Sequence, residues 1–555
     1  MARDYKKELE AATAAIVDTA HPKKIVVAGA GAGKTFAFGK LLDKLPTSPI
    51  ERRLVITFLG GLKRDLEKDL GEKARVQTFH GYCFTLLKQS ANIRTATGFT
   101  AEVRYVPRLG QLVRSDWVAS KGVAAPAFLP SLRGLVKDAE ADFFLARGLY
   151  YDAIGYDDST VHIHRALDAD HTLVPTHDLV IVDEVQDLNQ AEISIIDLLS
   201  SGSDIVVAGD DDQALYGRLR DASEEHIRTI YGRADYLKRN LPFCMRCPSV
   251  VVNATNDIIA EAHNRGLLGN RIQKPYDPYP RPVDAQYPTI KVVQVTVQTP
   301  ASNLFGKYIL DTISRIPAEE ITESREKGFP TVLIIGTKPY AGQVKTLLEA
   351  SGYAVETKAA PEERMEDPFT REDALEVLSH DEHSNLGWRI LLEADHPAGW
   401  EGWVAEAIST DTALYTLVEG SFRNAILAEL KTWEPEEVED PATIEELPID
   451  RPTIRITSFE GAKGMSAQHV FVLGLEDGKF PARRNAINSL DVRRMIVALT
   501  RTRKQCYLLM ARMGFTNGRR RLIRPSIFVE WIQATRRDVI SINAASFRLV
   551  KRDET

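Results

Sequence analysis

A glycine-rich loop follows a short apolar run near the N-terminus. The run Ile25-Val-Val-Ala28 leads into a loop and then into a stretch with helical patterning; the loop residues are Gly29, Ala30, Gly31, Ala32, Gly33, Lys34 and Thr35. Between a strand and a helix, such a loop can turn several backbone N–H groups toward one phosphate. Lys34 can then reach the β- and γ-phosphates of a nucleoside triphosphate, and the Thr35 hydroxyl can bind Mg²⁺. The segment from Ala28 to Thr35 is therefore the candidate triphosphate site.

Two adjacent carboxylates follow a second apolar run, Leu179-Val-Ile-Val182. At the end of a buried strand, Asp183 can bind the metal ion while Glu184 acts as the general base on an attacking water. A kinase or a small-molecule transferase can carry the same pair. Together, the loop and the carboxylates indicate a core that hydrolyses or transfers a nucleoside triphosphate.

Short β-branched runs predict the strands that would position these groups. One set covers 25–28, 54–57, 179–183 and 205–208, and a second covers 291–295, 331–335, 454–457, 470–473 and 507–510. Helical patterns separate the runs, which predicts two doubly wound α/β domains with parallel sheets. The proline-rich stretch from Lys274 to Pro288 is predicted to be an extended connector between them.

Two stretches of helical patterning interrupt the α/β alternation. The predicted boundaries are 1–87 with 176–230 for the first domain, 88–175 for a helical insertion, 231–361 with 451–555 for the second domain, and 362–450 for a short second insertion with an acidic linker. The second insertion ends in an acid-rich run, Glu434 to Asp450, which predicts a solvated linker. The basic side chains near the C-terminus are predicted to form a solvated face; they are Arg519, Arg520, Arg521, Arg524, Arg536 and Arg537.

Composition narrows the class of protein. The chain has 555 residues, a net charge of -7 and four cysteines. This charge argues against bulk attraction to nucleic acid, so any nucleic-acid site must be a local groove. The charged N-terminus and the lack of a long apolar run predict a cytoplasmic protein without a membrane partner. Cys244 and Cys247 have metal-ligand spacing, but only Cys83 and Cys506 remain to complete a zinc site, which favours packing roles.

Taken together, the motifs resemble those of superfamily 1A helicases of the UvrD/Rep/PcrA type. Residues 28–35 resemble that family's phosphate loop, which begins with Ala. The other matches occur in the family's order, and they are Val55–Phe58, Gln77–His80, Asp183–Gln190, Gly209–Tyr216, Phe243–Pro248, Gly461–Met465 and Val497–Arg501. The resemblance implies two RecA-like P-loop motor domains, each with a mainly helical insertion, and ATP with Mg²⁺ in the cleft between them.

The resemblance also implies roles for individual residues. Gln213 would sense the γ-phosphate, and Arg246 and Arg501 would stabilise the charge that develops during phosphoryl transfer. Asp187 would couple hydrolysis to movement. Met245 and Gly464 fall at nucleotide-contacting positions. Four residues match positions in the family's DNA groove, namely Phe58, Thr78, His80 and Tyr216.

Several positions depart from the family pattern. No glutamine precedes Gln77, although the family reads adenine with one, and Met245 stands where an aromatic residue usually stacks on the base. We therefore expect relaxed nucleotide preference. Glu460 replaces a usual histidine and Ser466 a common glutamate, and Arg220 matches a family arginine only with one inserted residue.

The resemblance favours an ATP-dependent DNA helicase or translocase that moves 3′ to 5′ on single-stranded DNA and unwinds partly duplex DNA. An alternative is a DNA-stimulated translocase or a nucleotide-sensing ATPase subunit that does not unwind. Such a subunit would work with a partner nuclease in DNA repair or antiviral defence. The short second insertion and the lack of a nuclease-like segment keep this alternative open.

Overall fold

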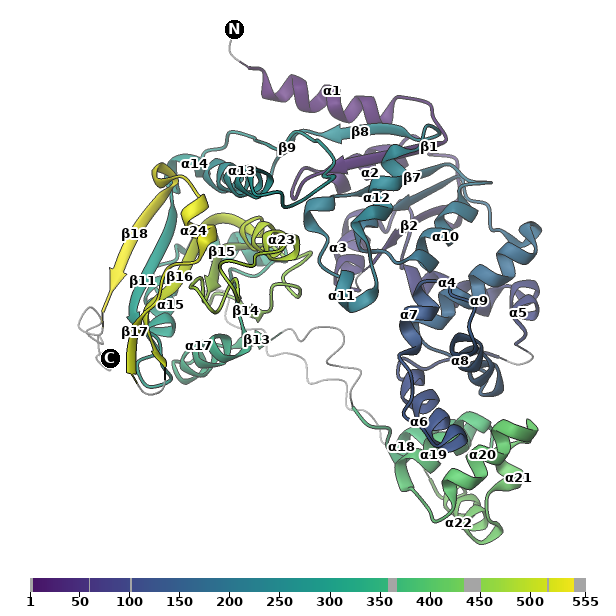
Figure 1. Cartoon of the computed structure of the whole chain (residues 1–555). Coiled ribbons are helices and arrows are strands. Elements are labelled where there is room, and N and C mark those ends of the chain that lie inside the picture. The colour runs from purple at the N-terminus through teal and green to yellow at the C-terminus, as the bar shows by residue number, and fades with distance from the viewer. Residues whose placement is uncertain are drawn as a thin grey trace.

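The computed structural model describes residues 3–58, 60–99, 102–357, 367–433, 451–516 and 519–543. These residues form two α/β bodies that stand side by side and a helical body that lies below the first of them in Figure 1. Both sheets are mainly parallel and have helices on their faces. The fold class predicted from the sequence, α/β with parallel sheets flanked by helices, is confirmed.

A six-stranded parallel sheet forms the first body. In spatial order its strands are β3 (Arg75–Thr78), β2 (Arg53–Thr57), β6 (Leu179–Val182), β7 (Ile205–Gly209), β1 (Lys23–Ala28) and β8 (Leu237–Leu241). Along β1, Ile25 and Val27 enter one hydrophobic core while Val26 and Ala28 enter the other. Burial of both faces explains why the strands read as continuous apolar runs.

Helices cover both faces of this sheet. Ile16 and Phe38 bring α1 and α2 into one core, and Phe79 and Ile195 bring α4 and α10 into the other. The helices of this body are α1 (Tyr5–Val17), α2 (Lys34–Leu42), α3 (Gly60–Leu70), α4 (Phe79–Gln89), α10 (Gln190–Leu199), α11 (Gly217–Arg220) and α12 (Glu224–Gly232).

An eight-stranded sheet forms the second body, and all its pairs are parallel except that of β16 with β17. In order, its strands are β13 (Val355–Thr357), β14 (Ile454–Thr457), β12 (Val332–Ile335), β15 (Ala467–Leu473), β16 (Thr502–Thr516), β11 (Ile290–Val297) and β18 (Arg537–Ile542), with β17 (Arg519–Leu522) beside β16. Its helices are α13 (Ser249–Asn264), α14 (Val283–Gln286), α15 (Leu304–Ile313), α16 (Ala318–Glu326), α17 (Lys338–Ala350), α23 (Ser489–Leu499) and α24 (Ile527–Trp531).

The two helical insertions share one hydrophobic core. The first contains α5 (Ala91–Thr97), α6 (Leu109–Lys121), α7 (Phe128–Arg133), α8 (Ala139–Tyr150), α9 (Tyr156–Ala169) and the short pair β4 (Arg104–Tyr105) and β5 (Ala153–Ile154). The second contains α18 (Arg371–His380), α19 (Asn385–Asp395), α20 (Trp400–Thr410), α21 (Leu414–Leu417) and α22 (Gly420–Leu430). Segments from opposite halves of the chain therefore build one accessory body (Figure 1).

A buried ionic cluster joins the two insertions. The Asp116 carboxylate on α6 accepts hydrogen bonds from Arg389 Nε on α19 at 2.6 Å, from Arg147 Nε at 2.9 Å and from the Tyr151 hydroxyl at 2.6 Å. Asp116 and Arg389 are both 0% exposed. A buried charge without a partner destabilises the fold. The Asp116 carboxylate of the first insertion and the Arg389 guanidinium of the second therefore depend on each other.

The region around the predicted domain boundary and connector contains more regular structure than the sequence predicts. Strand β8 pairs with β1, so the first sheet extends past residue 230. The proline-rich stretch contains β10 (Asp277–Pro278), which pairs with β9 (Phe243–Cys244), and it also contains α14. The acid-rich run 434–450 lies outside the described residues. Among the helices described, none has the length and apolar character that crossing a bilayer requires.

The basic residues near the C-terminus divide into two groups. Arg520, Arg521 and Arg524 are exposed. Arg536 instead donates a 2.8 Å bond from Nε to Asp257, and Arg537 donates a 2.7 Å bond from Nη1 to the Val529 carbonyl. The last two arginines therefore hold the C-terminal strand rather than form a solvated face.

Candidate active site

The glycine-rich loop runs from the end of β1 to the start of α2. Gly31 and Gly33 have φ angles of +69° and +89°, in the left-handed region that glycine adopts most readily. A Cβ on Gly31 would lie 2.5 Å from the Cβ of Arg246, and a Cβ on Gly29 would lie 2.4 Å from the Tyr276 ring. Glycine at these positions thus lets residues from beyond the first sheet pack directly on the loop.

Lys34 lies between the two predicted catalytic carboxylates. Its Nζ is 2.9 Å from Asp183 and 2.8 Å from Glu184. Burial alone would lower the pKa of Lys34, but the two carboxylates outweigh it and raise the pKa above its usual value. Burial and the neighbouring Glu184 raise the pKa of Asp183. Glu184 behaves in the opposite way, because Lys34 and Lys463 outweigh its burial and lower its pKa.

The backbone of Glu184 is strained. Its φ angle is +58°, which is uncommon for a residue with a side chain and recurs at functional sites. Gln186 Nε2 donates a 2.5 Å bond to one carboxylate oxygen, and Lys34 binds the other. The two contacts fix the carboxylate that we predicted to activate water.

The residues around Lys34 fit a magnesium-bound triphosphate. The positive φ angles curl the loop at the N-terminal end of α2, where unpaired backbone N–H groups favour phosphate. Asp183 and Thr35 offer carboxylate and hydroxyl oxygens, the hard ligands that Mg²⁺ prefers. Asp183 already faces a cation, the Lys34 ammonium. These two residues would hold the ion.

Gln213 and Arg501 meet although they lie in different bodies. Arg501 Nη2 donates a 3.0 Å hydrogen bond to Gln213 Oε1, and Gln213 Nε2 donates a 2.6 Å bond to Asp210. The Arg501 guanidinium also donates to the carbonyls of Val497 and Met465. Burial and the charge of Arg246 lower the pKa of Arg501 to about 10. The arginine is thus held in a fixed orientation toward the first body.

Lys463 is a functional candidate that our reading of the sequence did not assign. Its Nζ pairs with Asp187, lies 3.6 Å from Glu184 and donates a 2.6 Å bond to the Gln213 carbonyl. Burial raises the pKa of Asp187 to about 6 despite this pairing. The sequence feature that could have identified Lys463 is its position within Gly461–Met465, a segment that resembles a motif of the helicase family. A second cation from the second body therefore reaches Glu184, the predicted general base, and Asp187.

The other two predicted nucleotide contacts lie close to the first body. Met245 N donates a 2.8 Å bond to the Gly31 carbonyl, which places the residue beside the phosphate loop. Gly464 has a φ of +78°, and a Cβ there would lie 2.7 Å from Leu62 on α3. Gly464 therefore allows close approach of the two bodies. The nearby Cys244 and Cys247, like Cys83 and Cys506, are buried and free.

Three of the four predicted DNA contacts form one buried cluster. Phe58, His80 and Tyr216 are 4%, 5% and 3% exposed, and the Phe58 and Tyr216 rings are 5.2 Å apart. Arg220 lies 4.3 Å above the Phe58 ring and donates a 3.2 Å bond to His80. Contact between these rings and DNA therefore requires the cluster to open.

Thr78 has a separate structural role. Its hydroxyl accepts a 3.1 Å bond from Gly81 N and caps α4. A contact from this residue to a DNA phosphate would compete with the cap.

The fold and the site define a protein of two RecA-like bodies with a P-loop, in which charged side chains from the second body reach the candidate nucleotide site of the first. A family model described as an AAA domain matches residues 12–218, which include the phosphate loop, both carboxylates and Gln213.

Known helicases resemble the chain over part of its length. It is 26% identical over 298 residues to the ATP-dependent DNA helicase PcrA of Staphylococcus aureus, covering 46% of this chain and 40% of that protein. It is 26% identical over 308 residues to PcrA of Staphylococcus epidermidis, covering 47% and 41%. The predicted resemblance to UvrD/Rep/PcrA-type helicases is confirmed, over less than half the length of these relatives.

Proposed function

We propose that this protein is an ATP-dependent DNA motor that hydrolyses ATP with Mg²⁺ and moves 3′ to 5′ along single-stranded DNA, separating duplex as it moves. One observation carries the proposal. The pocket formed by Lys34, Asp183 and Glu184 is completed by Arg501 and Lys463 from the second body. A site that needs both bodies links the chemistry of the nucleotide to their relative position.

Each residue has a role in the proposed hydrolysis. Thr35 and Asp183 would hold Mg²⁺, which would supply positive charge beside the phosphates. Glu184 accepts the proton of the attacking water, and Gln213 orients that water toward the γ-phosphate. Arg501 stabilises the negative charge that grows on the transferred group, with Arg246 beside it. The role of Arg246 is inferred from its neighbours: its Cβ lies against Gly31 of the phosphate loop, and its charge lowers the pKa of Arg501.

Movement would follow from the contacts between the bodies. Lys463 pairs with Asp187, and the Tyr216 hydroxyl donates a 3.1 Å bond to the Glu460 carbonyl. Both contacts join the pocket region to the segment that contains Glu460 and Lys463. A change at the phosphates that shifts this segment would also shift Tyr216 and, through it, the aromatic cluster with Phe58. Opening of that cluster would admit DNA.

A motor that translocates without unwinding is the second candidate. The observation that favours it is the accessory body, because the second insertion packs on the first and, over the described residues 367–433, contributes the short helices α18 to α22. Such a motor would act in the cytoplasm beside a partner nuclease in repair or defence. A nucleotide-sensing subunit is the third candidate, and it would hydrolyse ATP without moving.

The test compares three activities of the purified full chain. ATP hydrolysis is measured with and without single-stranded DNA, followed by strand separation on duplexes with a 3′ or a 5′ overhang and by displacement of a protein bound to single-stranded DNA. Unwinding from the 3′ overhang supports the helicase, and displacement without unwinding supports the translocase. Hydrolysis that DNA does not stimulate supports the sensor. Absence of ATP hydrolysis under all conditions refutes the proposal.

A further inference from the structure

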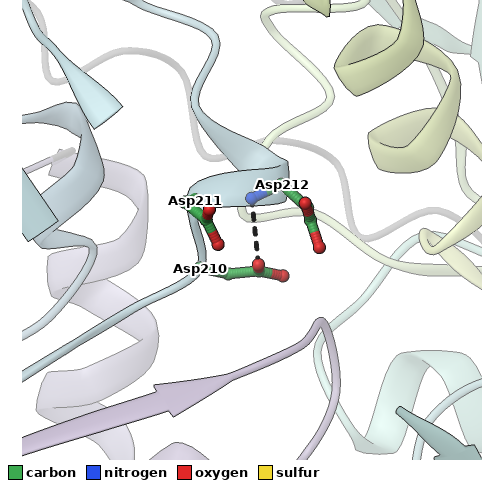
Figure 2. Close-up of side chains that lie close together, drawn as sticks. All are labelled: Asp210, Asp211 and Asp212. Carbon is green, nitrogen blue, oxygen red and sulfur yellow. Dashed lines mark hydrogen bonds between the residues drawn. The ribbon is translucent and has the colours of Figure 1, made fainter. Parts of the chain in front are cut away.

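Three consecutive aspartates after β7 surround a lysine. Asp210, Asp211 and Asp212 lie together (Figure 2), and they are 3%, 0% and 3% exposed. Their spacing would suit a metal ion. The Lys274 ammonium, however, lies 2.8 Å, 2.7 Å and 2.8 Å from the three carboxylates. The ammonium therefore lies where a metal ion would bind, and Arg271 and Arg228 add two further positive charges beside Asp212 and Asp211. The function of the cluster then depends on the other groups that the aspartates bind.

The same cluster is anchored by further groups. Arg271 Nε donates bonds of 2.8 Å and 2.7 Å to Asp212, and Ile272 N donates a 2.9 Å bond to Asp211. Arg271, Ile272 and Lys274 lie on the segment that follows α13 and leads to the second sheet. Burial alone would lower the pKa of Lys274, but the three carboxylates outweigh it and raise the pKa, which keeps the ammonium charged.

Asp210 connects this cluster to Gln213, the predicted sensor of the γ-phosphate. One oxygen of Asp210 faces Lys274, and the other accepts a 2.6 Å bond from Gln213 Nε2. The carbonyl oxygen of the Gln213 amide accepts a 3.0 Å bond from Arg501. Both ends of the amide are thus fixed, so it cannot rotate without losing a charge-assisted bond. The amide nitrogen has two N–H groups, and Asp210 uses one.

We propose that Lys274 and Asp210 are positioning residues that hold the Gln213 amide with its second N–H directed at the γ-phosphate or the attacking water. The inference rests on the proposed function. Fixing a polar group in advance lowers the reorganisation needed in the transition state, so the effect falls on turnover rather than on nucleotide affinity. Because Lys274 lies on a segment of the second body that contacts the first, movement between the bodies would also release the Gln213 amide.

The test uses the full chain, four single variants and one double variant. Lys274→Met should lower kcat for ATP by about tenfold or more and change KM by less than about threefold. Lys24→Met is the matched control, since Lys24 is also buried and bonded, at 2.9 Å to the Ile16 carbonyl, but belongs to the far end of β1. Its kcat should stay within about twofold of the unchanged chain. An unchanged kcat for Lys274→Met overturns the inference.

A double-mutant cycle separates positioning from a general structural effect. In a Gln213→Ala background, Lys274→Met should reduce kcat by less than about twofold further, because its effect passes through the glutamine. If the kcat loss of the double variant equals the product of the two single losses, Lys274 acts independently of Gln213 and the inference is overturned.

Asp210→Asn covers the case in which Lys274→Met does not fold. An asparagine whose oxygen faces Lys274 turns its N–H₂ toward Gln213 Nε2, so two donors meet and the glutamine amide must flip. We expect the same loss of kcat in a chain that still unfolds cooperatively, with a melting temperature lowered by the loss of one charge from the buried cluster. Normal turnover in this variant overturns the inference.

A binding measurement keeps the inference separate from the proposed function. The ratio of the affinity for ADP with aluminium fluoride, which mimics the transferred phosphoryl group, to the affinity for ADP alone reports binding of the transition state without turnover. Asp210→Asn and Lys274→Met should each reduce this ratio by about fivefold, even in a chain that proves unable to hydrolyse ATP. An unchanged ratio in both variants overturns the positioning role whether or not the chain hydrolyses ATP.

Discussion

Arg501 of the second body donates a 3.0 Å hydrogen bond to Gln213 of the first. If this arginine stabilises the transferred phosphoryl group, Arg501→Lys should lower kcat by about 100-fold, because an ammonium cannot reproduce the planar set of donors. ATP hydrolysis under saturating nucleotide measures the effect.

The control for this substitution is Arg503→Lys. Arg503 is two positions further along the chain, donates a 2.9 Å bond to Ser466 and lies 3.9 Å above the Phe329 ring, away from Gln213. We expect its turnover to stay within about threefold of the unchanged chain. Equal losses in the two variants would mean that Arg501 acts through folding.

Glu184 and Lys34 have separable roles although they touch. Glu184→Gln keeps the size of the side chain but removes the base, so turnover should fall by at least about 1,000-fold while nucleotide affinity stays within about fivefold. Lys34→Ala removes a phosphate contact, so it should lower both the turnover and the nucleotide affinity. Titration with a fluorescent ATP analogue and a hydrolysis assay measure the two quantities. Normal hydrolysis by Glu184→Gln would show that another group is the base.

The strands were predictable where the sheet is buried on both faces. Leu179–Val182 and Ile205–Gly209 lie inside the first sheet, and their apolar runs identified them. Arg75–Thr78 and Leu237–Leu241 went unpredicted because they form the two edges of that sheet, where one side lacks a neighbouring strand and polar residues are tolerated. The same reason applies to Arg537–Ile542 at the edge of the second sheet.

The candidate site was predictable only where its residues form local patterns. Lys34 and Asp183 belong to such patterns. Lys274 does not, because its partners are more than sixty positions away and its neighbours along the chain suggest only a proline-rich connector. The burial of Phe58 and Tyr216 depends on Arg220 and on the Glu460 carbonyl, and no local pattern reports such tertiary contacts.

Base preference provides a third prediction. Met245 lies beside the phosphate loop through its bond to Gly31, and a thioether packs against any base without reading its edge. We expect kcat/KM values for ATP and GTP within about fivefold of each other. Competition between the two nucleotides in one hydrolysis assay measures the ratio. A preference for ATP of a hundredfold would mean that other residues read adenine.

The fourth prediction concerns the accessory body. Arg389→Met leaves Asp116 buried with one of its two arginines, so the free energy of unfolding should fall by about 3 kcal/mol. Five of the six tryptophans belong to this body, so urea unfolding followed by tryptophan fluorescence reports on it; they are Trp117, Trp388, Trp400, Trp403 and Trp433. The control is Arg165→Met, which breaks an exposed pair with Asp142 and should leave the transition unchanged. Equal transitions for Arg389→Met and the unchanged chain would show that the ionic cluster does not hold the insertions together.

Acid should destabilise the protein through its buried histidines. Burial lowers the pKa of His162 to about 3, against 6.5 for an ordinary imidazole, and its ring lies 5.0 Å from Phe99. Between these two pKa values the unfolded chain binds a proton that the folded chain does not, so the contribution of His162 to stability is lost as the pH falls from 6.5 toward 3. Replacing the imidazole by leucine removes this proton uptake. As the pH falls from 6 to 4, the free energy of unfolding of His162→Leu should therefore rise relative to that of the unchanged chain, by about 1.4 kcal/mol for each pH unit. Urea unfolding at several pH values measures the difference, and Phe99→Leu, which alters the same contact without a titrating group, should show a constant offset. A constant offset for His162→Leu as well would mean that the histidine is protonated in the folded protein.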